Sequence, residues 1–174
     1  MLKRTHTCGR LRLDDVEKNV NLAGWVHSYR DHGNLVFIDL RDREGITQLV
    51  FDPETQVETH KIARTLRTEW VIAATGKVQP RSDGMENPKL ATGQIEVAIE
   101  SLEILNTSRT PPFELDSAEK THEEHRLGAR YIDLRRPEML KKMGIRPRVT
   151  KITRDYSDML GFWEIATPML ATRT

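Results

Sequence analysis

Five strand-like segments follow one another in the first two thirds of this 174-residue chain. Their residues are enriched in Val, Ile and Leu and alternate with polar residues, the pattern of half-buried β-strands. The segments cover residues 20–30, 34–41, 46–51, 69–79 and 93–105. Glycine-bearing polar loops separate the first two segments and the last two. A chain with this succession is expected to form a mainly β domain.

A helical segment interrupts the strands after the third. Ile62, Ala63, Leu66 and Trp70 recur there at helical spacing behind Pro53. Three strands, a helix and two more strands are the order of the five-stranded Greek-key barrel called the OB-fold. The sequence therefore predicts an OB-fold barrel over residues 1–106.

The second strand places an aromatic ring where a hydrophobic core cannot use it. Alternation puts Val36, Ile38 and Leu40 on one face of this strand. Leu35, Phe37, Asp39 and Arg41 then lie on the opposite, polar face. A ring on the outside of a barrel is a candidate platform for stacking an unpaired nucleic-acid base.

Polar residues on neighbouring strands extend this candidate site. Alternation puts Gln48 and Glu96 on the outer face, and Arg30 enters the first loop. An amide and a carboxylate can read base edges, and a guanidinium can contact a base or a phosphate. The alternative is that Gln48 and Glu96 are ordinary solvated surface residues.

Charge and composition limit the possible functions. The formal net charge is only +1, with 27 Lys and Arg against 26 Asp and Glu, which favours a narrow nucleic-acid footprint over a broad one. No apolar run approaches the ~20 residues of a membrane span, and no secretory signal is visible. The single cysteine, Cys8, cannot form an internal disulfide, so a cytoplasmic setting is expected.

The sequence offers few alternatives to a binding function. No GxxxxGK[ST] or GxGxxG phosphate loop is present. His122 and His125 are expected at the surface, and no metal site is expected. Asp39, Asp42 and Glu44 alternate with arginines, which favours surface ion pairs over acid–base catalysis.

The residue composition of the chain changes after the fifth strand. The paired prolines Pro111 and Pro112 indicate a linker or hinge over residues 107–137. In the following segment, residues 138–174, a helix is expected with Val149, Ile152, Tyr156 and Leu160 on one stripe. A strand-like segment that ends at Pro168 follows it.

Four stretches together carry a family signature. They read THTCGRLRLDDVEKNVNLAGWVHSYRDHGNLVFIDLRDREGITQLVFDP, NPKLATGQIEV, RYIDLRRPEM and GFWEIATPML. They resemble the N-terminal anticodon-binding domain of bacterial aspartyl-tRNA synthetases, followed by the start of the class II catalytic domain. The last stretch is similar to the first class II motif, a helix and a strand that ends in proline and builds the dimer interface in the family. The resemblance implies a partial α/β stub over residues 138–174 and a homodimeric parent enzyme.

The resemblance also implies roles for individual residues. The anticodon contacts of the family fall on Arg30, Phe37, Gln48, Asn87 and Glu96, with Phe37 stacking on the middle base. Relatives that charge only tRNA-Asp tend to carry an apolar residue at the position of His32, and Lys and Asn at those of Gly84 and Met85. His32, Gly84 and Met85 therefore favour a nondiscriminating domain that accepts tRNA-Asp and tRNA-Asn.

The family's chemistry is expected outside this chain. The parent would form aspartyl-adenylate from ATP and aspartate with Mg²⁺ and transfer aspartate to tRNA, but its ATP- and aspartate-binding segments follow Thr174. This chain is therefore expected to hold no cofactor, no catalytic residue and no activity alone. Small residues replace the family's large or charged ones at Gly128, Ala129 and Ala166, either by natural divergence or by alteration of a truncated domain. A generic single-strand-binding OB module and a dimerisation module remain alternatives.

Overall fold

The computed structural model describes residues 3–168 and divides the chain into two compact units. The first unit covers Met1–Pro112 and the second covers Phe113–Thr174. Each unit is described by itself.

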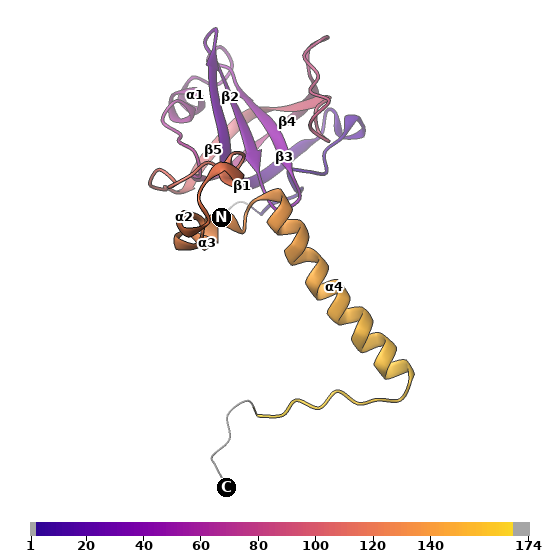
Figure 1. Ribbon diagram of the computed structural model, residues 1–174. Coiled ribbons are helices and arrows are strands. Elements are labelled where there is room, and N and C mark those ends of the chain that lie inside the picture. The colour runs from indigo at the N-terminus through magenta and orange to yellow at the C-terminus, as the bar shows by residue number, and fades with distance from the viewer. Residues whose placement is uncertain (1–2, 169–174) are drawn as a thin grey trace. The chain divides into compact units, whose positions relative to one another are not determined.

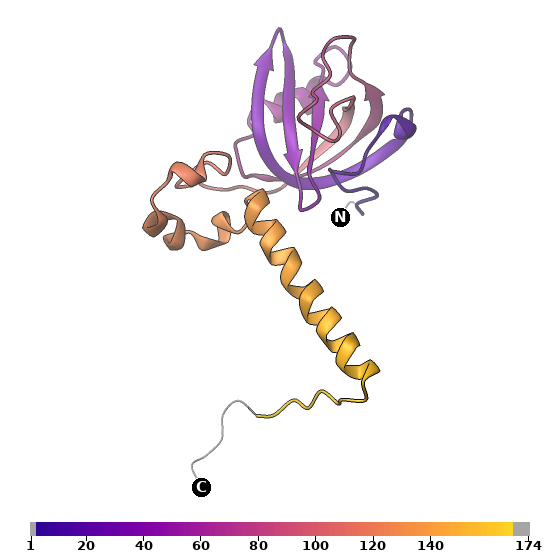
Figure 2. The same ribbon diagram turned by 45° about the vertical axis from the view of Figure 1, so that its right-hand side comes forward.

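The first unit is a closed five-stranded barrel (Figures 1 and 2). Its strands are β1 (Asn19–His32), β2 (Leu35–Arg41), β3 (Ile46–Phe51), β4 (Val71–Pro80) and β5 (Ile95–Asn106). Their order around the barrel is β1-β2-β3-β5-β4. β3 and β5 pair in parallel, and all other pairs are antiparallel. The predicted five-stranded OB-fold is confirmed.

The barrel interior is filled by the inward residues of every strand, as alternation requires. Val36, Ile38 and Leu40 of β2 are fully buried, as the sequence predicts. The other strands contribute a matching set of aliphatic side chains and one aromatic ring to the same core, among them Leu22, Leu49, Phe51, Ile72 and Val97.

β1 pairs with two neighbouring strands and contains a bulge. Residues 19–25 pair with β4, and residues 25–32 pair with β2. The register shifts between Val26 and Ser28, so His27 is the extra residue. Gly24 lies just before this point, where an added Cβ would come within 2.3 Å of the Arg41 carbonyl oxygen. The close approach of β1 and β2 therefore requires glycine there.

The connections at the two ends of the barrel differ in length. β1 and β2 are joined by Gly33 and Asn34, which both have positive φ (59° and 75°), as a two-residue type I′ hairpin requires. The β4–β5 connection runs over residues 81–94 and contains no helix or strand. Helix α1 (Val57–Ala63) lies between β3 and β4, as predicted. It is shorter than the spacing suggested, and Ile62 is 39% exposed whereas Ala63 and Leu66 are buried.

Arg41 departs from the predicted polar face. It is 6% exposed, and its Nη2 donates to Oε1 of Glu69 at 2.7 Å. Its Nη1 lies 2.9 Å from Nδ1 of His27. Asp42 is also buried, and it accepts from the backbone amides of Cys8, Glu44 and Gly45. The expectation of surface ion pairs is wrong for these two residues, because each is buried against a residue distant in sequence, Glu69 for Arg41 and Cys8 for Asp42.

The second unit contains helices only, within its described residues 113–168. They are η2 (Ala118–Lys120), α2 (Glu123–Gly128), α3 (Arg130–Asp133) and α4 (Pro137–Met159). The segment expected as a hinge holds the first three of these helices. A small core of Phe113, Leu115, Ala118, Ala129 and Ile132 stabilises it.

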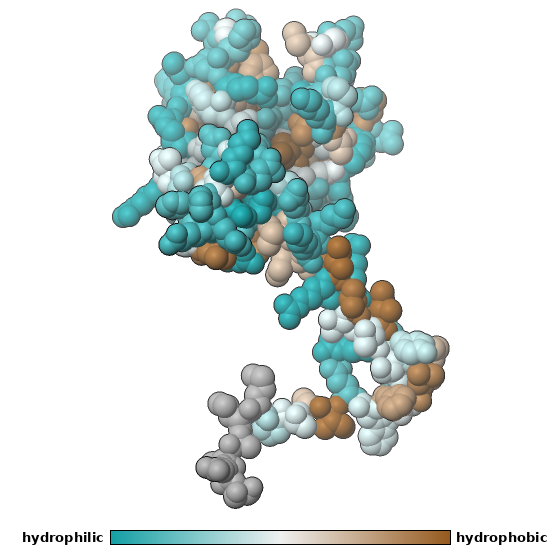
Figure 3. Space-filling model, in the orientation of Figure 1, coloured by the Kyte–Doolittle hydropathy of each residue, from teal (hydrophilic) through white to brown (hydrophobic). Residues whose placement is uncertain are grey.

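Helix α4 leaves apolar side chains in solvent along its length (Figure 3). Val149, Ile152, Tyr156 and Leu160 are between 54% and 66% exposed, so the predicted stripe exists and is uncovered in this chain. Residues 162–168, where the sequence predicts a strand, form none. A strand needs a hydrogen-bonded neighbour, and no described strand pairs with this segment. The end of the expected catalytic-domain stub, residues 169–174, lies outside the described residues.

Candidate nucleic-acid interface

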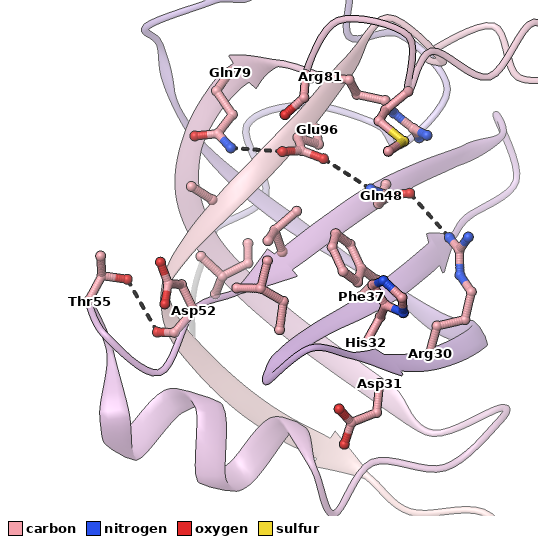
Figure 4. A pocket seen from close by; sticks show the side chains of 16 residues that line it. Arg30, Asp31, His32, Phe37, Gln48, Asp52, Thr55, Gln79, Arg81 and Glu96 are labelled. Carbon is pink, nitrogen blue, oxygen red and sulfur yellow. Dashed lines mark hydrogen bonds between the residues drawn. The ribbon is translucent and has the colours of Figure 1, made fainter.

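A groove of about 870 Å³ opens on the outer face of the barrel (Figure 4). Its walls come from all five strands, from the segment between β3 and α1 and from the start of the β4–β5 loop. Six of the eight residues proposed from the sequence line it, namely Arg30, His32, Phe37, Gln48, Met85 and Glu96. The tertiary fold thus brings together side chains that lie up to 66 positions apart, from Arg30 to Glu96.

Phe37 lies on the outer face of β2, as alternation predicts. It pairs with Arg30 of β1 on one side and Val50 of β3 on the other. Its ring is partly exposed and lines the groove near His32 (Figure 4). A ring held by strands on both sides loses little conformational entropy when a base stacks on it.

A chain of hydrogen bonds crosses the groove beside this ring. Nη2 of Arg30 donates to Oε1 of Gln48 at 3.1 Å, and Nε2 of Gln48 donates to Oε2 of Glu96 at 3.0 Å (Figure 4). Nε2 of Gln79 donates to the other oxygen of Glu96 at 2.8 Å. Arg30 also donates to Asp39, which accepts from Ser28 as well. The network fixes the orientation of each polar group before any ligand binds.

The remaining two proposed residues lie in the β4–β5 loop and do not line the groove. Asn87 shapes the loop, because its Oδ1 accepts from the backbone amide of Lys89 at 3.0 Å. Its backbone amide donates to the Gly93 carbonyl oxygen at 2.9 Å. Gly84 has a positive φ of 79° and open space around its Cα. In this structure, Asn87 and Gly84 therefore set the path of the loop.

Sequence reasoning missed the other groove-lining residues, among them Gln79 and Arg81. Gln79 follows the buried Val78 on β4, so the alternation used for the other strands would have found it. Arg81 follows Pro80 at the end of β4, outside any strand, and no periodic signal marks it. It is nevertheless only 9% exposed, and its Nε donates to the Ile95 carbonyl oxygen of β5.

The described residues offer no site for a metal ion. No group of three or more His, Cys, Asp or Glu side chains within residues 3–168 is arranged to bind one. No helix in the same range is long and apolar enough to cross a membrane.

Comparison with known families divides the chain much as the structure does. Residues 20–105 match the model of the OB-fold nucleic acid binding domain, called tRNA_anti-codon. Residues 122–174 match the class II tRNA synthetases of the D, K and N kind. The two models together describe an anticodon-binding OB domain followed by the start of a class II tRNA synthetase. The first match lies in the barrel and the second in the helical unit.

Curated relatives cover nearly the whole of this chain. It is 49% identical over 173 residues to the aspartate–tRNA(Asp/Asn) ligase of Desulfatibacillum aliphaticivorans, covering 99% of this chain and 29% of the relative. It is 50% identical over 173 residues to the ligase of the same name from Moorella thermoacetica, with the same two coverages. The chain thus spans less than a third of the length of these relatives.

Solved synthetases share the fold. The asparaginyl-tRNA synthetase of Pyrococcus horikoshii, solved with asparaginyl-adenylate, matches with a TM-score of 0.83 and 25% identity over 97% of this chain and 37% of its own. The aspartyl-tRNA synthetase of Entamoeba histolytica matches with a TM-score of 0.85 and 22% identity over 97% of this chain and 40% of its own.

Proposed function

We propose that this chain recognises a tRNA anticodon through the barrel groove, as the N-terminal part of an aspartate–tRNA ligase. The observation that carries the proposal is the Phe37 ring, which lines a groove next to the Arg30–Gln48–Glu96 hydrogen-bond chain. Recognition of single-stranded RNA requires both features. An aromatic ring stacks on a base, and fixed polar groups form hydrogen bonds with the edges of the bases.

The polar groups keep hydrogen-bonding capacity for a ligand. Each Glu96 oxygen accepts one bond from a glutamine, and a carboxylate oxygen can accept two. Nε2 of Gln48 carries a second hydrogen, and Arg30 has donors beyond the Nη2 group that contacts Gln48. Glu96 is therefore suited to a base amino group, and Gln48 and Arg30 are suited to base carbonyl or ring nitrogen acceptors. Asn87 would act through the conformation of the β4–β5 loop.

The choice of tRNA is the finer part of the proposal. His32 and Met85 line the groove, and Gly84 adds no side chain to it. None of the three presents the Lys–Asn pair that the family resemblance associates with discrimination. The relatives' names, which cover Asp and Asn tRNAs, support a nondiscriminating domain for tRNA-Asp and tRNA-Asn.

The parent enzyme would form aspartyl-adenylate from ATP and aspartate with Mg²⁺ and transfer aspartate to the tRNA. No residue of this chain is assigned to ATP or Mg²⁺, and only the start of the catalytic domain is matched, over residues 122–174. We therefore expect residues 1–174 alone to catalyse no aspartate-dependent pyrophosphate exchange.

A homodimer and a cytoplasmic location are proposed for the parent on the family resemblance, and the uncovered stripe of α4 is compatible with a dimer contact.

Titration of the chain with RNA stem-loops tests the recognition proposal. The Asp anticodon stem-loop should bind more tightly than a stem-loop of equal length with a scrambled loop. Equal affinities would favour a generic single-strand-binding module. Sedimentation with and without residues 138–174 tests the third possibility, a dimerisation module, because such a module would dimerise whether or not RNA is present.

A further inference from the structure

Arg81 is a buried, positively charged side chain at the groove that takes no part in the Arg30–Gln48–Glu96 hydrogen-bond chain. It directly follows β4, lines the groove and is 9% exposed. Its Nε donates to the Ile95 carbonyl oxygen at 3.1 Å, which fixes the side chain against β5. Its Nη2 is buried and has no hydrogen-bond partner. A buried charged donor without a hydrogen-bond partner lowers the stability of the folded protein. Its presence here therefore suggests a functional role.

Other cations near the groove are already engaged. Arg30 contacts Asp39 at 3.2 Å and Gln48 at 3.1 Å. Arg81, by contrast, takes part in none of the ion pairs found among residues 3–168. Burial lowers the pKa of Arg81, while the charges of Glu96 and Asp39 act in the opposite direction. A guanidinium nevertheless stays protonated at neutral pH.

The charge balance of the groove makes this cation important for an RNA ligand. Asp31, Asp52 and Glu96 line the groove and oppose the approach of a phosphate, whereas Arg30 and Arg81 favour it. Since Arg30 is paired with Asp39, Arg81 is the groove-lining cation without a carboxylate partner among the described residues. Single-stranded RNA brings one phosphodiester with every base that it places on Phe37.

We propose that Arg81 binds a phosphodiester oxygen of the RNA segment that enters the groove, with Nη2 as a donor. The proposal rests on the proposed function of the groove in anticodon binding. The ligand oxygen would satisfy the orphan donor and offset the cost of holding the guanidinium out of water. Because Nη2 is covered in the free protein, a small shift of the β4–β5 loop accompanies binding.

A charge-matched pair of variants tests the assignment. Arg81→Met removes the guanidinium and keeps an unbranched apolar stem, and Arg43→Gln removes one charge from an exposed position outside the groove. Binding of the Asp anticodon stem-loop is measured by fluorescence anisotropy at several salt concentrations. We expect Arg81→Met to weaken binding about tenfold or more and to lower the slope of log K against log salt by about 0.7. Arg43→Gln should change affinity less than about twofold.

A backbone substitution in the RNA separates a phosphate contact from a base contact. Stem-loops with one uncharged methylphosphonate are compared at each linkage of the anticodon. At one linkage, the substitution should weaken binding to the wild type about tenfold but leave binding to Arg81→Met nearly unchanged. If the two losses add at every linkage, or if Arg81→Met alters base preference with an unchanged salt slope, the phosphate assignment is overturned.

Stability and a second variant complete the design. Arg81→Met should unfold at a temperature close to that of the wild type, because the loss of the Nε hydrogen bond to Ile95 and the removal of an unsatisfied buried charge act in opposite directions. A lower temperature together with unchanged RNA affinity would mean that Arg81 is structural only.

Phe37→Ala distinguishes the two proposals: if it weakens binding while Arg81→Met does not, only the Arg81 proposal fails. If neither variant has an effect, the groove is not the RNA site and both proposals fail.

Discussion

Gln48 donates from Nε2 to Oε2 of Glu96 at 3.0 Å and thereby joins the outer faces of β3 and β5. A carboxylate only accepts hydrogen bonds, so the amide nitrogen of Gln48 must face Glu96 and its oxygen must face Arg30. The amide cannot flip without losing both bonds. Gln48 therefore presents a fixed pattern of donor and acceptor to the groove.

Replacing Phe37 by alanine should weaken binding of the Asp anticodon stem-loop by about 1 to 3 kcal/mol, the contribution of one stacked base. Phe37→Tyr keeps an aromatic face and should lie within about twofold of the wild type. Anisotropy titration of the three proteins provides the measurement. An unchanged affinity for the alanine variant would remove Phe37 from the binding site.

Glu96→Gln should weaken stem-loop binding by about 1 to 3 kcal/mol. The reason is that the neutral glutamine amide accepts a hydrogen bond from a base amino group less strongly than the negatively charged carboxylate does. The unfolding free energy should fall by no more than about 1.5 kcal/mol, since the variant's Oε1 still accepts one amide bond. Glu100→Gln, at an exposed position on the same strand, serves as the control. Equal affinities of the two variants would contradict a reading role for Glu96.

Affinities of the wild type for the tRNA-Asp and tRNA-Asn stem-loops should differ by less than about tenfold, because Gly84 and Met85 offer no polar side-chain group to select one third base. Introducing His32→Leu with Met85→Asn, both at groove-lining positions, should widen this ratio in favour of tRNA-Asp. Parallel titrations of both RNAs measure it. A wild-type ratio above about a hundredfold, near 3 kcal/mol, would refute nondiscriminating recognition.

Glu69→Gln should lower the free energy of unfolding by about 3 kcal/mol, because it leaves the buried Arg41 guanidinium without its carboxylate. The two charged side chains are 8% and 5% exposed, whereas those of Lys61 and Glu58 are 65% and 82% exposed. Glu58→Gln should therefore cost less than about 0.5 kcal/mol. The double variant Arg41→Met/Glu69→Leu should recover much of the loss. Urea unfolding of each protein tests these values, and an equal effect of the two single variants would contradict them.

Cys8 should make the protein less stable at alkaline pH. Burial, and then the Asp42 carboxylate, raise the pKa of its thiol above the usual range. Above about pH 8.5 the thiol of the unfolded chain loses its proton while that of the folded chain keeps it, so stability falls by at most about 1.4 kcal/mol per pH unit. The contribution is fully present below that pH. Urea unfolding between pH 7 and 10 should show a shallower decline for Cys8→Ala, and identical declines would exclude this effect.

The periodicity of β2 was sufficient to predict where Phe37 lies, because both of its neighbours in the strand are core residues. Alternation also put Gln48 and Glu96 on the face where they are found hydrogen-bonded to each other. Their roles in RNA binding remain predictions. The same reasoning was wrong for Arg41, because burial at the barrel end depends on Glu69 and His27, which come from other segments.

The sequence by itself determined the five strands, the residues that fill the barrel and the outward direction of the Phe37 ring. These follow from a period of two residues, which is a local property of each strand. Tertiary structure alone decided that Arg30 joins Phe37, because alternation from Val26 would turn Arg30 inward and the bulge at His27 reverses it. It also decided the burial of Arg81, since loop packing and strand register depend on contacts between segments far apart in the chain.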